Sequence, residues 1–312
     1  MKIVFLDALT IGAGSFAALE ALGEFVGYGD STLQEGMQRV SDCDVLIVNK
    51  FKVTAQLLDA APRLRLVCES GTGMNNIDVA ACTERGIPVR NVAAYSTDTV
   101  AQTTFMHILS LLGNAPHFDE AVKSGAYSRS RILTEVFTPF TEAAGKTLGI
   151  IGLGAIGRKV AQIGEALGMR ICYYSTSGAN HTSDYPERSL EDLLRTADVV
   201  SIHAPMTDRT RGLIADRELG LMKPTAFLVN MGRGGIVDEA ALVRAVDDGT
   251  IAGAAVDVFT REPLPEEHPY LQARHPERFR FTPHIGWGSE EARTRLVEGI
   301  AENIRSWKEE QA

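Results

Sequence analysis

Short apolar runs alternate with helix-length segments through almost the whole chain, and this alternation constrains the fold more than any other feature. The runs at 45–48 and 147–151 are nearly continuous in apolar residues, which is typical of strands buried on both faces. The segments between the runs carry helical spacing, as at Leu190, Leu193 and Leu194. The pattern therefore predicts βαβ units and parallel sheets.

The predicted strands are too many for one compact sheet, and a chain of 312 residues suits about two domains. A long apolar helix is predicted over 100–112, an irregular stretch over 114–145 and a terminal helix over 290–308. The first domain is predicted to end before Ser96. The predicted strands lie at 3–6, 45–48, 66–68, 88–90, 147–151, 170–174, 199–202, 226–230, 254–256 and 279–281.

Composition excludes several classes of function. The net charge of −9 disfavours nucleic acid or an anionic membrane as the main partner, because either needs a basic surface. No run approaches the roughly 18 apolar residues of a membrane span, and the N-terminus has no signal-peptide pattern. The four cysteines are scattered, which indicates free thiols in a reducing cytoplasm. No set of residues has metal-ligand spacing, so no metal is expected.

A GxGxxG motif follows the strand at 147–151 and precedes a predicted helix at 158–167. Gly152 permits the tight turn, Gly154 lets the backbone approach a pyrophosphate, and Gly157 lets the helix pack on the strand. The helix N-terminus then faces the anion with its N–H groups. Because a second strand follows at βαβ distance, the motif predicts dinucleotide binding.

The acidic residue expected at the end of the second strand, to bind the ribose 2′-hydroxyl, is missing. Ser175, Thr176 and Ser177 stand there instead. Hydroxyls bond a 2′-hydroxyl or a 2′-phosphate and do not repel the phosphate, yet no Arg or Lys follows immediately to attract it. The sequence therefore leaves NAD and NADP open as cofactors.

Several separated motifs resemble, in order, those of the D-isomer-specific 2-hydroxyacid dehydrogenases, which include D-lactate dehydrogenases and glyoxylate/hydroxypyruvate reductases. The resemblance covers essentially the whole chain. Besides the glycine loop, the motifs are GTGMNNID at 71–78, HAPMT at 203–207 with Thr210, NMGRGGIVD at 230–238, DVFTREP at 257–263 and TPHIG at 282–286. The resemblance implies a Rossmann nucleotide domain, residues 98–286, inserted into a flavodoxin-like substrate domain of residues 1–97 and 287–312.

The family's catalytic trio corresponds to Arg233, Glu262 and His284, and elementary chemistry suits these types. A guanidinium binds the carboxylate of a 2-oxo acid and polarises its ketone. An imidazole supplies or removes the proton near neutral pH. A neighbouring carboxylate favours the imidazolium and orients the ring, so Glu262 is expected to tune His284. The competing interpretations are a solvated surface residue for Arg233, a turn residue for Glu262 and a packed loop residue for His284.

The resemblance also implies binding residues. Asp257 corresponds to the position that bonds the nicotinamide carboxamide, and the backbone after Ser70 is expected to face the substrate carboxylate. Trp287 either walls the substrate pocket or anchors the terminal helix, and Lys50 is either a substrate contact or a solvated loop residue. The predicted cofactor contacts are Gly152, Gly154, Ala155, Ile156, Gly157, Ser175, Thr176, Ser177, His203, Pro205, Thr210 and Asp257, and the predicted substrate contacts are Lys50, Ser70, Gly71, Thr72 and Trp287.

The sequence thus predicts a cytoplasmic, homodimeric NAD(P)-dependent dehydrogenase that interconverts a small 2-oxo acid of the pyruvate, hydroxypyruvate or glyoxylate class and the D-2-hydroxy acid. The helix at 100–112 and the stretch at 114–145 are candidates for dimer packing, with internal packing as the alternative. Two other functions stay open: phosphite-type oxidation on the same scaffold, and a dinucleotide-sensing, corepressor-like binding protein. Formate oxidation is disfavoured, because formate dehydrogenases of this fold pair the histidine with Gln rather than with a residue such as Glu262.

Overall fold

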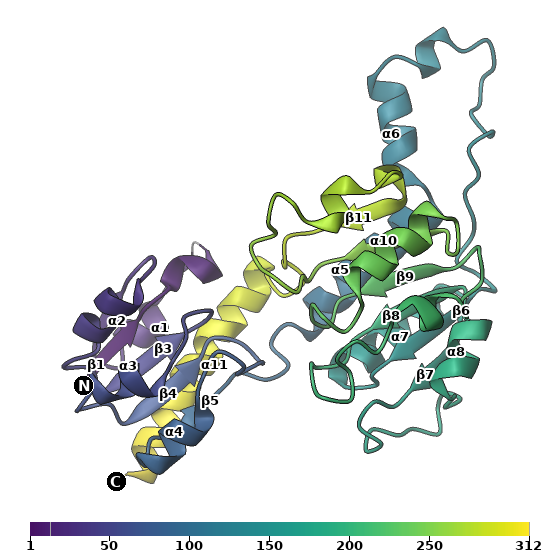
Figure 1. Ribbon diagram of the computed structural model, residues 1–312. Coiled ribbons are helices and arrows are strands. Elements are labelled where there is room, and N and C mark those ends of the chain that lie inside the picture. Colours follow the sequence, from purple (N-terminus) through teal and green to yellow (C-terminus); the bar gives the residue numbers. More distant parts are fainter. Residues whose placement is uncertain (13, 312) are drawn as a thin grey trace. The chain divides into compact units, whose positions relative to one another are not determined.

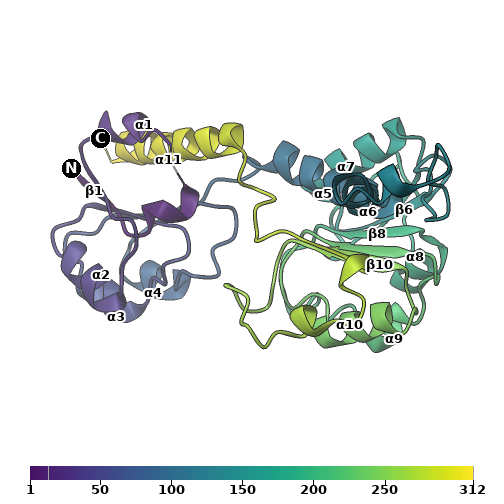
Figure 2. The same cartoon turned by 90° about the horizontal axis from the view of Figure 1, so that it is seen from above.

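The computed structural model describes residues 1–12 and 14–311, and the chain divides into two compact units. Unit 1 comprises Met1–Ser96 and Trp287–Ala312, and unit 2 comprises Thr97–Gly286. Each unit is built on one parallel sheet with helices on both faces (Figures 1 and 2). The predicted class, an α/β protein with two doubly wound parallel sheets, is confirmed.

Unit 1 has a five-stranded sheet in the order β2-β1-β3-β4-β5. The strand order reverses between β1 and β3, as in flavodoxin-like folds. The strands are β1 (Lys2–Phe5), β2 (Glu24–Gly27), β3 (Val45–Val48), β4 (Leu66–Glu69) and β5 (Val89–Arg90). The helices are η1 (Ala8–Ile11), α1 (Ala17–Glu20), α2 (Leu33–Arg39), α3 (Ala55–Asp59), α4 (Val79–Glu84) and α11 (Glu290–Glu310).

Successive residues of the central strands enter two different cores. Ile3 and Phe5 of β1 pack in the core beneath α1 and α11, whereas Val4 packs in the core beneath α2, α3 and α4. Ile47 and Leu46 of β3 divide in the same way. Because side chains of a strand alternate between faces, a strand covered on both sides must be apolar throughout. This explains the continuous apolar runs of the sequence.

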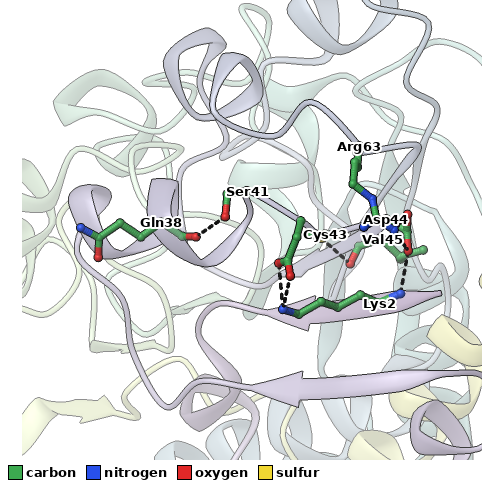
Figure 3. Close-up of polar contacts among 8 residues, drawn as sticks. Lys2, Gln38, Ser41, Cys43, Asp44, Val45 and Arg63 are labelled. Atoms are coloured by element: carbon green, nitrogen blue, oxygen red, sulfur yellow. Dashed lines mark hydrogen bonds and ion pairs between the residues drawn. The ribbon is translucent and has the colours of Figure 1, made fainter.

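Polar contacts join neighbouring segments at the end of this sheet where the strands begin (Figure 3). The backbone N–H of Lys2 donates to Asp44 Oδ2 at 2.7 Å, and Arg63 Nη2 lies 3.1 Å from Asp44 Oδ1. The thiol of Cys43 donates to the carbonyl of Val45 at 3.0 Å. These groups bind one another, and the predicted substrate residues Lys50 and Ser70 follow the opposite ends of the strands.

Unit 2 has a six-stranded sheet in the order β11-β10-β9-β8-β6-β7, whose strand order reverses between β6 and β8. In Figure 2 helices α5 and α7 cover one face, and α8, α9 and α10 cover the other. The strands are β6 (Thr147–Ile151), β7 (Arg170–Tyr174), β8 (Val199–Ile202), β9 (Phe227–Asn230), β10 (Gly253–Val256) and β11 (Phe279–Phe281). The helices are α5 (Thr97–Leu112), α6 (Ala115–Lys123), α7 (Ala155–Ala166), α8 (Leu190–Thr196), α9 (Asp216–Leu219), α10 (Glu239–Asp247), η2 (Tyr127–Arg129), η3 (Pro269–Gln272) and η4 (Pro276–Arg278).

Residues 114–140, here called the arm, carry α6 and an irregular segment that leave the body of unit 2 before the chain returns to β6 (Figure 1). All of α6 is described, and none of its residues is buried. Large apolar side chains of the arm are exposed, among them Val122, Leu133, Val136, Phe137 and Phe140. None of the helices in the described part of the chain is both long and apolar enough to cross a bilayer.

Candidate active site

The glycine loop joins β6 to α7, and two of its glycines are required by close backbone contacts. Gly152 has φ +95°, and a Cβ there would lie 2.9 Å from the nitrogen of Ala204. A Cβ at Gly157 would lie 2.2 Å from the carbonyl oxygen of Gly152. A Cβ at Gly154 would meet nothing within 4 Å. The loop is therefore tight at Gly152 and Gly157 and open at Gly154, where a phosphate group can approach the start of α7.

A cavity of about 470 Å³ lies beside this loop. Its position, at the carboxyl ends of β6 and β8 where the strand order reverses, is where open α/β sheets bind ligands. The size and the donor groups fit the phosphate and adenosine part of a dinucleotide. The lining residues are Gly152, Leu153, Gly154, Ser175, Thr176, Ser177, Asn180, His203, Pro205, Thr207, Asp208 and Arg209.

His203 lines the cavity, and Thr210 holds the loop that follows β8 beside it. His203 Nε2 lies 2.8 Å from Ser201 Oγ, and its Nδ1 is buried without a partner in the described chain. Burial lowers the pKa of His203 to about 3, so the ring is neutral at neutral pH. Thr210 Oγ1 donates to the carbonyl of Pro205 at 2.7 Å, and the N–H of Thr207 donates to Thr210 Oγ1 at 2.8 Å. Thr210 therefore holds the loop after β8 rather than lining the cavity.

His284 and Glu262 form a hydrogen-bonded pair. His284 Nδ1 lies 2.7 Å from Glu262 Oε2, and the side chains are 20% and 32% exposed, so both are accessible to a small molecule. The N–H of Phe259 donates to Glu262 Oε1 at 3.0 Å and orients this carboxylate. His284 has φ +54°, a left-handed backbone conformation that is unusual outside glycine. Its N–H donates to the carbonyl of Asp257 at 2.8 Å, which holds that conformation.

Arg233 lies in the loop after β9 and is half-buried. The Asn230 side chain braces this loop, because its Oδ1 accepts from the N–H of Gly232 at 3.1 Å and its Nδ2 donates to the carbonyl of Arg233 at 3.2 Å. A Cβ at Gly234 would lie 2.0 Å from the carbonyl carbon of Phe259. The loops that carry Arg233 and Glu262 can approach this closely only because Gly234 has no side chain.

Asp257 is 2% exposed and fixes the loop that carries His284. Its Oδ1 accepts from Thr282 Oγ1 at 2.6 Å and from the N–H of Ile285 at 2.9 Å. Its Oδ2 accepts from the N–H of Gly286 at 2.9 Å. A carboxylate has about four acceptor positions, so Asp257 keeps capacity for one more donor.

His107 and Thr282, to which the sequence motifs assign no role, complete this network. His107 Nε2, on α5, lies 3.0 Å from Thr282 Oγ1. Because the Thr282 hydroxyl donates to Asp257, its oxygen accepts from His107 Nε2–H. Burial lowers the pKa of His107, which keeps the ring neutral. The pairing joins positions far apart in the sequence, so no local motif could have indicated it.

The predicted substrate residues lie in unit 1, and Lys50 and Ser70 follow the ends of β3 and β4. Asp7, which is 2% exposed, accepts N–H groups from Asn49, Lys50 and Phe51 at 2.9, 2.6 and 2.8 Å. Asn49 Nδ2 also donates to the carbonyl of Ser70, which ties the ends of β3 and β4 together. The unit thus holds the backbone near Lys50 and Ser70 in one fixed arrangement.

Gly71, Thr72 and Trp287 complete the predicted substrate set, and each lies in a defined setting within unit 1. The carbonyl of Gly71 accepts from the N–H of Val92 at 3.0 Å, and Thr72 Oγ1 donates to the carbonyl of Val92 at 3.0 Å. Trp287 packs against the core beneath α11, with its ring 6.4 Å from that of Tyr95. The contact of Trp287 is that of a residue anchoring the terminal helix, and a role in a substrate pocket stays a prediction.

Known proteins resemble this chain over most of its length. Residues 105–286 match the model of the D-isomer specific 2-hydroxyacid dehydrogenase NAD-binding domain. The chain is 43% identical to a glyoxylate reductase of Aeropyrum pernix over 81% of its own length and 76% of the relative's. It is 32% identical to a hydroxypyruvate reductase of Blautia hydrogenotrophica over 98% and 97%. A solved D-lactate dehydrogenase of Aquifex aeolicus, complexed with NAD and lactic acid, superposes with a TM-score of 0.86 at 27% identity, covering 99% of this chain and 96% of that one.

This chain belongs to the D-isomer specific 2-hydroxyacid dehydrogenase family. It is an oxidoreductase of the CH–OH group of 2-hydroxy acids and uses a nicotinamide dinucleotide. The predicted family is thereby confirmed. Among the described residues, no group of three or more His, Cys, Asp or Glu side chains is arranged to hold a metal ion.

Proposed function

We propose that the enzyme catalyses reversible hydride transfer between a nicotinamide dinucleotide and a small 2-oxo or 2-hydroxy acid, with glyoxylate and hydroxypyruvate as the first candidates. The observation that carries the proposal is the 2.7 Å contact between His284 Nδ1 and Glu262 Oε2. The names of the glyoxylate and hydroxypyruvate reductases among its relatives support the choice of substrates.

His284 acts as the acid in reduction and as the base in oxidation. A hydrogen bond from Nδ1–H to Glu262 fixes the ring and leaves Nε2 for the substrate oxygen. In reduction, Nε2–H gives its proton to the carbonyl oxygen as the bound nicotinamide supplies hydride to the carbon. In oxidation, Nε2 removes the hydroxyl proton. Glu262 stabilises the charged imidazolium, as a nearby carboxylate does in general.

Arg233 binds the substrate carboxylate. Its Nη1 donates to the carbonyl of Gly232 at 2.8 Å, which holds the guanidinium in place. A guanidinium has five N–H donors in a planar fork, so donors remain for a two-point contact with a carboxylate. The same positive charge polarises the adjacent ketone, which makes its carbon a better acceptor of hydride. Ser70, Gly71, Thr72, Lys50 and Trp287 are proposed as further substrate contacts.

Asp257 and the glycine loop position the cofactor. The remaining acceptor position of Asp257 suits a carboxamide N–H of the nicotinamide. The N–H groups of Ala155, Ile156 and Gly157 stand at the start of α7, where helical N–H groups lack partners within the helix and favour a pyrophosphate. Ser175, Thr176, Ser177, His203 and Pro205 are proposed as the adenosine contacts, since they line the cavity.

We also propose that the enzyme is a homodimer whose partner covers the arm. Leu133 and Phe137 of the arm are 91% and 80% exposed, and apolar surface of this kind marks a site of association. Light scattering at assay concentration is expected to give a dimer mass, and Phe137→Asp is expected to lower that mass. A monomer in the wild type would contradict the dimer. The four cysteines are buried free thiols, which supports a reducing, cytoplasmic location.

Initial rates with NADH and NADPH against a panel of 2-oxo acids test the proposed reaction. We expect turnover of glyoxylate or hydroxypyruvate to the 2-hydroxy acid, of D configuration where the product is chiral. His284→Ala is expected to reduce kcat by about 10²- to 10⁴-fold, the usual contribution of a positioned acid or base. Turnover of phosphite without turnover of any 2-oxo acid, or a fully active His284→Ala variant, would contradict the proposal.

A further inference from the structure

We propose that the cavity beside the glycine loop binds an adenosine 2′-phosphate, and that Arg209 is the residue that selects NADP(H) over NAD(H). The inference rests on the proposed function only for the class of cofactor. It depends on residues 175–177, which follow β7, and on the side chain of Arg209 from the loop after β8, all of which line the cavity.

The three residues after β7 present hydroxyls where a carboxylate would bind a ribose 2′-hydroxyl. Ser175 Oγ accepts from the N–H of Gly178 at 3.2 Å, and Ser177 Oγ accepts from the N–H of Ala179 at 3.1 Å. Each oxygen is therefore already used as an acceptor, and its O–H hydrogen is left to donate. Phosphate oxygens are acceptors only, so this end of the cavity suits a phosphate.

Arg209 brings a positive charge to the same place from another loop. Its Nη1 lies 3.4 Å from the carbonyl oxygen of Ser177, so the guanidinium reaches the segment after β7. The other N–H groups remain for an anion, and Arg binds phosphate through several donors at once. Arg158 Nη2 donates to the carbonyl of His181 at 3.0 Å, which adds a second guanidinium along that segment.

Asp208 lines the cavity as well, and it favours the opposite selectivity. A carboxylate accepts from a ribose 2′-hydroxyl and repels a 2′-phosphate. We assign the selectivity to Arg209 because its side chain is the one bonded to the segment after β7. Asp208 thus favours NAD(H) and Arg209 favours NADP(H), and substituting each residue in turn shows which of the two determines the selectivity.

Calorimetric titration of the full-length enzyme with 2′,5′-ADP and with 5′-AMP tests the inference without requiring turnover. The two probes differ only in the 2′-phosphate. The variants are Arg209→Gln and Asp208→Asn, with Arg211→Gln as the matched control, because Arg211 is an exposed arginine two residues further along the same loop. The ratio of kcat/KM for NADPH to that for NADH is measured on the same proteins.

We expect the wild type to bind 2′,5′-ADP more tightly than 5′-AMP and to prefer NADPH. Arg209→Gln is expected to weaken the binding of 2′,5′-ADP by about 10- to 100-fold, the range for loss of a hydrogen bond to a charged group. The same variant should leave the affinity for 5′-AMP nearly unchanged. Asp208→Asn should raise the affinity for 2′,5′-ADP, and Arg211→Gln should change the affinity for neither probe. Equal or tighter binding of 5′-AMP by the wild type, or an equal loss of both probes in Arg209→Gln, would overturn the inference. An enzyme that discriminates the probes but reduces no 2-oxo acid would contradict the proposed function and leave this inference standing.

Discussion

The two sheets differ at the point where their strand order reverses: in unit 1 this point is filled by a side chain, and in unit 2 it is open. In unit 1, between β1 and β3, the buried carboxylate of Asp7 accepts the N–H groups of Asn49, Lys50 and Phe51. In unit 2, between β6 and β8, the turn contains Gly154, where an added Cβ would meet nothing within 4 Å, and a cavity of about 470 Å³ lies beside it. One crevice is satisfied by an anion of the protein itself, and the other is open to an anion from outside.

The difference teaches how related architectures acquire different tasks. Crevices at the carboxyl ends of parallel strands collect backbone N–H groups, which attract anions. A carboxylate built into the sequence, as at Asp7, makes the crevice a rigid support. A glycine at the same kind of place, as at Gly154, leaves room for a phosphate. We therefore expect substitutions in the glycine loop of unit 2 to change cofactor binding, and a substitution of Asp7 in unit 1 to change stability.

The largest effect is expected from Gly157→Ala. Its Cβ would lie 2.2 Å from the carbonyl oxygen of Gly152, so the glycine loop and α7 must separate. We expect binding of both nicotinamide cofactors to be lost and the free energy of unfolding to fall by roughly 1–3 kcal/mol. The matched control is Gly154→Ala, which should keep the wild-type melting temperature yet weaken cofactor binding by about tenfold or more. A Gly154→Ala variant as unstable as Gly157→Ala would contradict this account.

Gly234→Ala tests the close approach of the loops that carry Arg233 and Glu262. The added Cβ would lie 2.0 Å from the carbonyl carbon of Phe259, which forces the two loops apart. Displacement of a catalytic group by about 1 Å can cost about 100-fold in rate, and we expect a loss of that order in kcat/KM. Gly14→Ala is the control, because its Cβ would meet nothing within 4 Å. Unchanged kcat/KM in Gly234→Ala would show that the two loops need not be this close.

Asp7→Asn tests whether the buried carboxylate of unit 1 contributes to stability and not to nucleotide binding. The amide keeps one acceptor oxygen but loses the charge that binds three N–H groups. We expect denaturant unfolding to show a loss of about 1.5–3 kcal/mol, as for hydrogen bonds to a charged group, with 5′-AMP affinity unchanged. Asp59→Asn is the control, since its ion pair with Arg85 is on the surface and is worth about 0–1 kcal/mol. Weakened 5′-AMP binding in Asp7→Asn would contradict the division of tasks.

The smallest effect concerns thiol labelling. Burial raises the pKa of Cys43 and Cys68, both in unit 1, to about 12, and it raises the pKa of Cys172 in unit 2. The native thiols should therefore react slowly with a thiol reagent at pH 8, and faster only when a unit opens. We expect 5′-AMP to slow the labelling of Cys172 and to leave that of Cys68 unchanged, as followed by mass spectrometry. Equal protection of both would indicate that the two units open together.

Much of the fold could be predicted from the sequence, because buried parallel strands require continuous apolar runs. The strands at 45–48, 147–151, 170–174 and 199–202 were predicted with the bounds that the structure has. Strand β2 could not be predicted in this way, since its sequence is EFVG and none of its residues is buried. The helix predicted at 158–167 begins earlier, at Ala155, because the glycine motif itself forms its first turn.

Parts of the candidate site could be predicted only where local sequence determines geometry. The glycine loop is local and its motif predicts it, and the family resemblance predicts the pairing of Glu262 with His284. Arg209 reaches Ser177 across 32 residues, and His107 reaches Thr282 across 175. Such contacts depend on the order of strands in the sheet, which the sequence pattern does not specify.

The central claim is that Arg233 binds the substrate carboxylate while His284 moves the proton. The most direct test measures two quantities on the same variants. One is the affinity of the enzyme, saturated with reduced cofactor, for oxamate, an unreactive 2-oxo acid analogue, and the other is kcat. We predict that His284→Gln keeps oxamate binding within a few-fold but loses about 10²- to 10⁴-fold in kcat. Arg233→Gln is predicted to lose both. Wild-type oxamate binding in Arg233→Gln, or wild-type kcat in His284→Gln, would contradict the account.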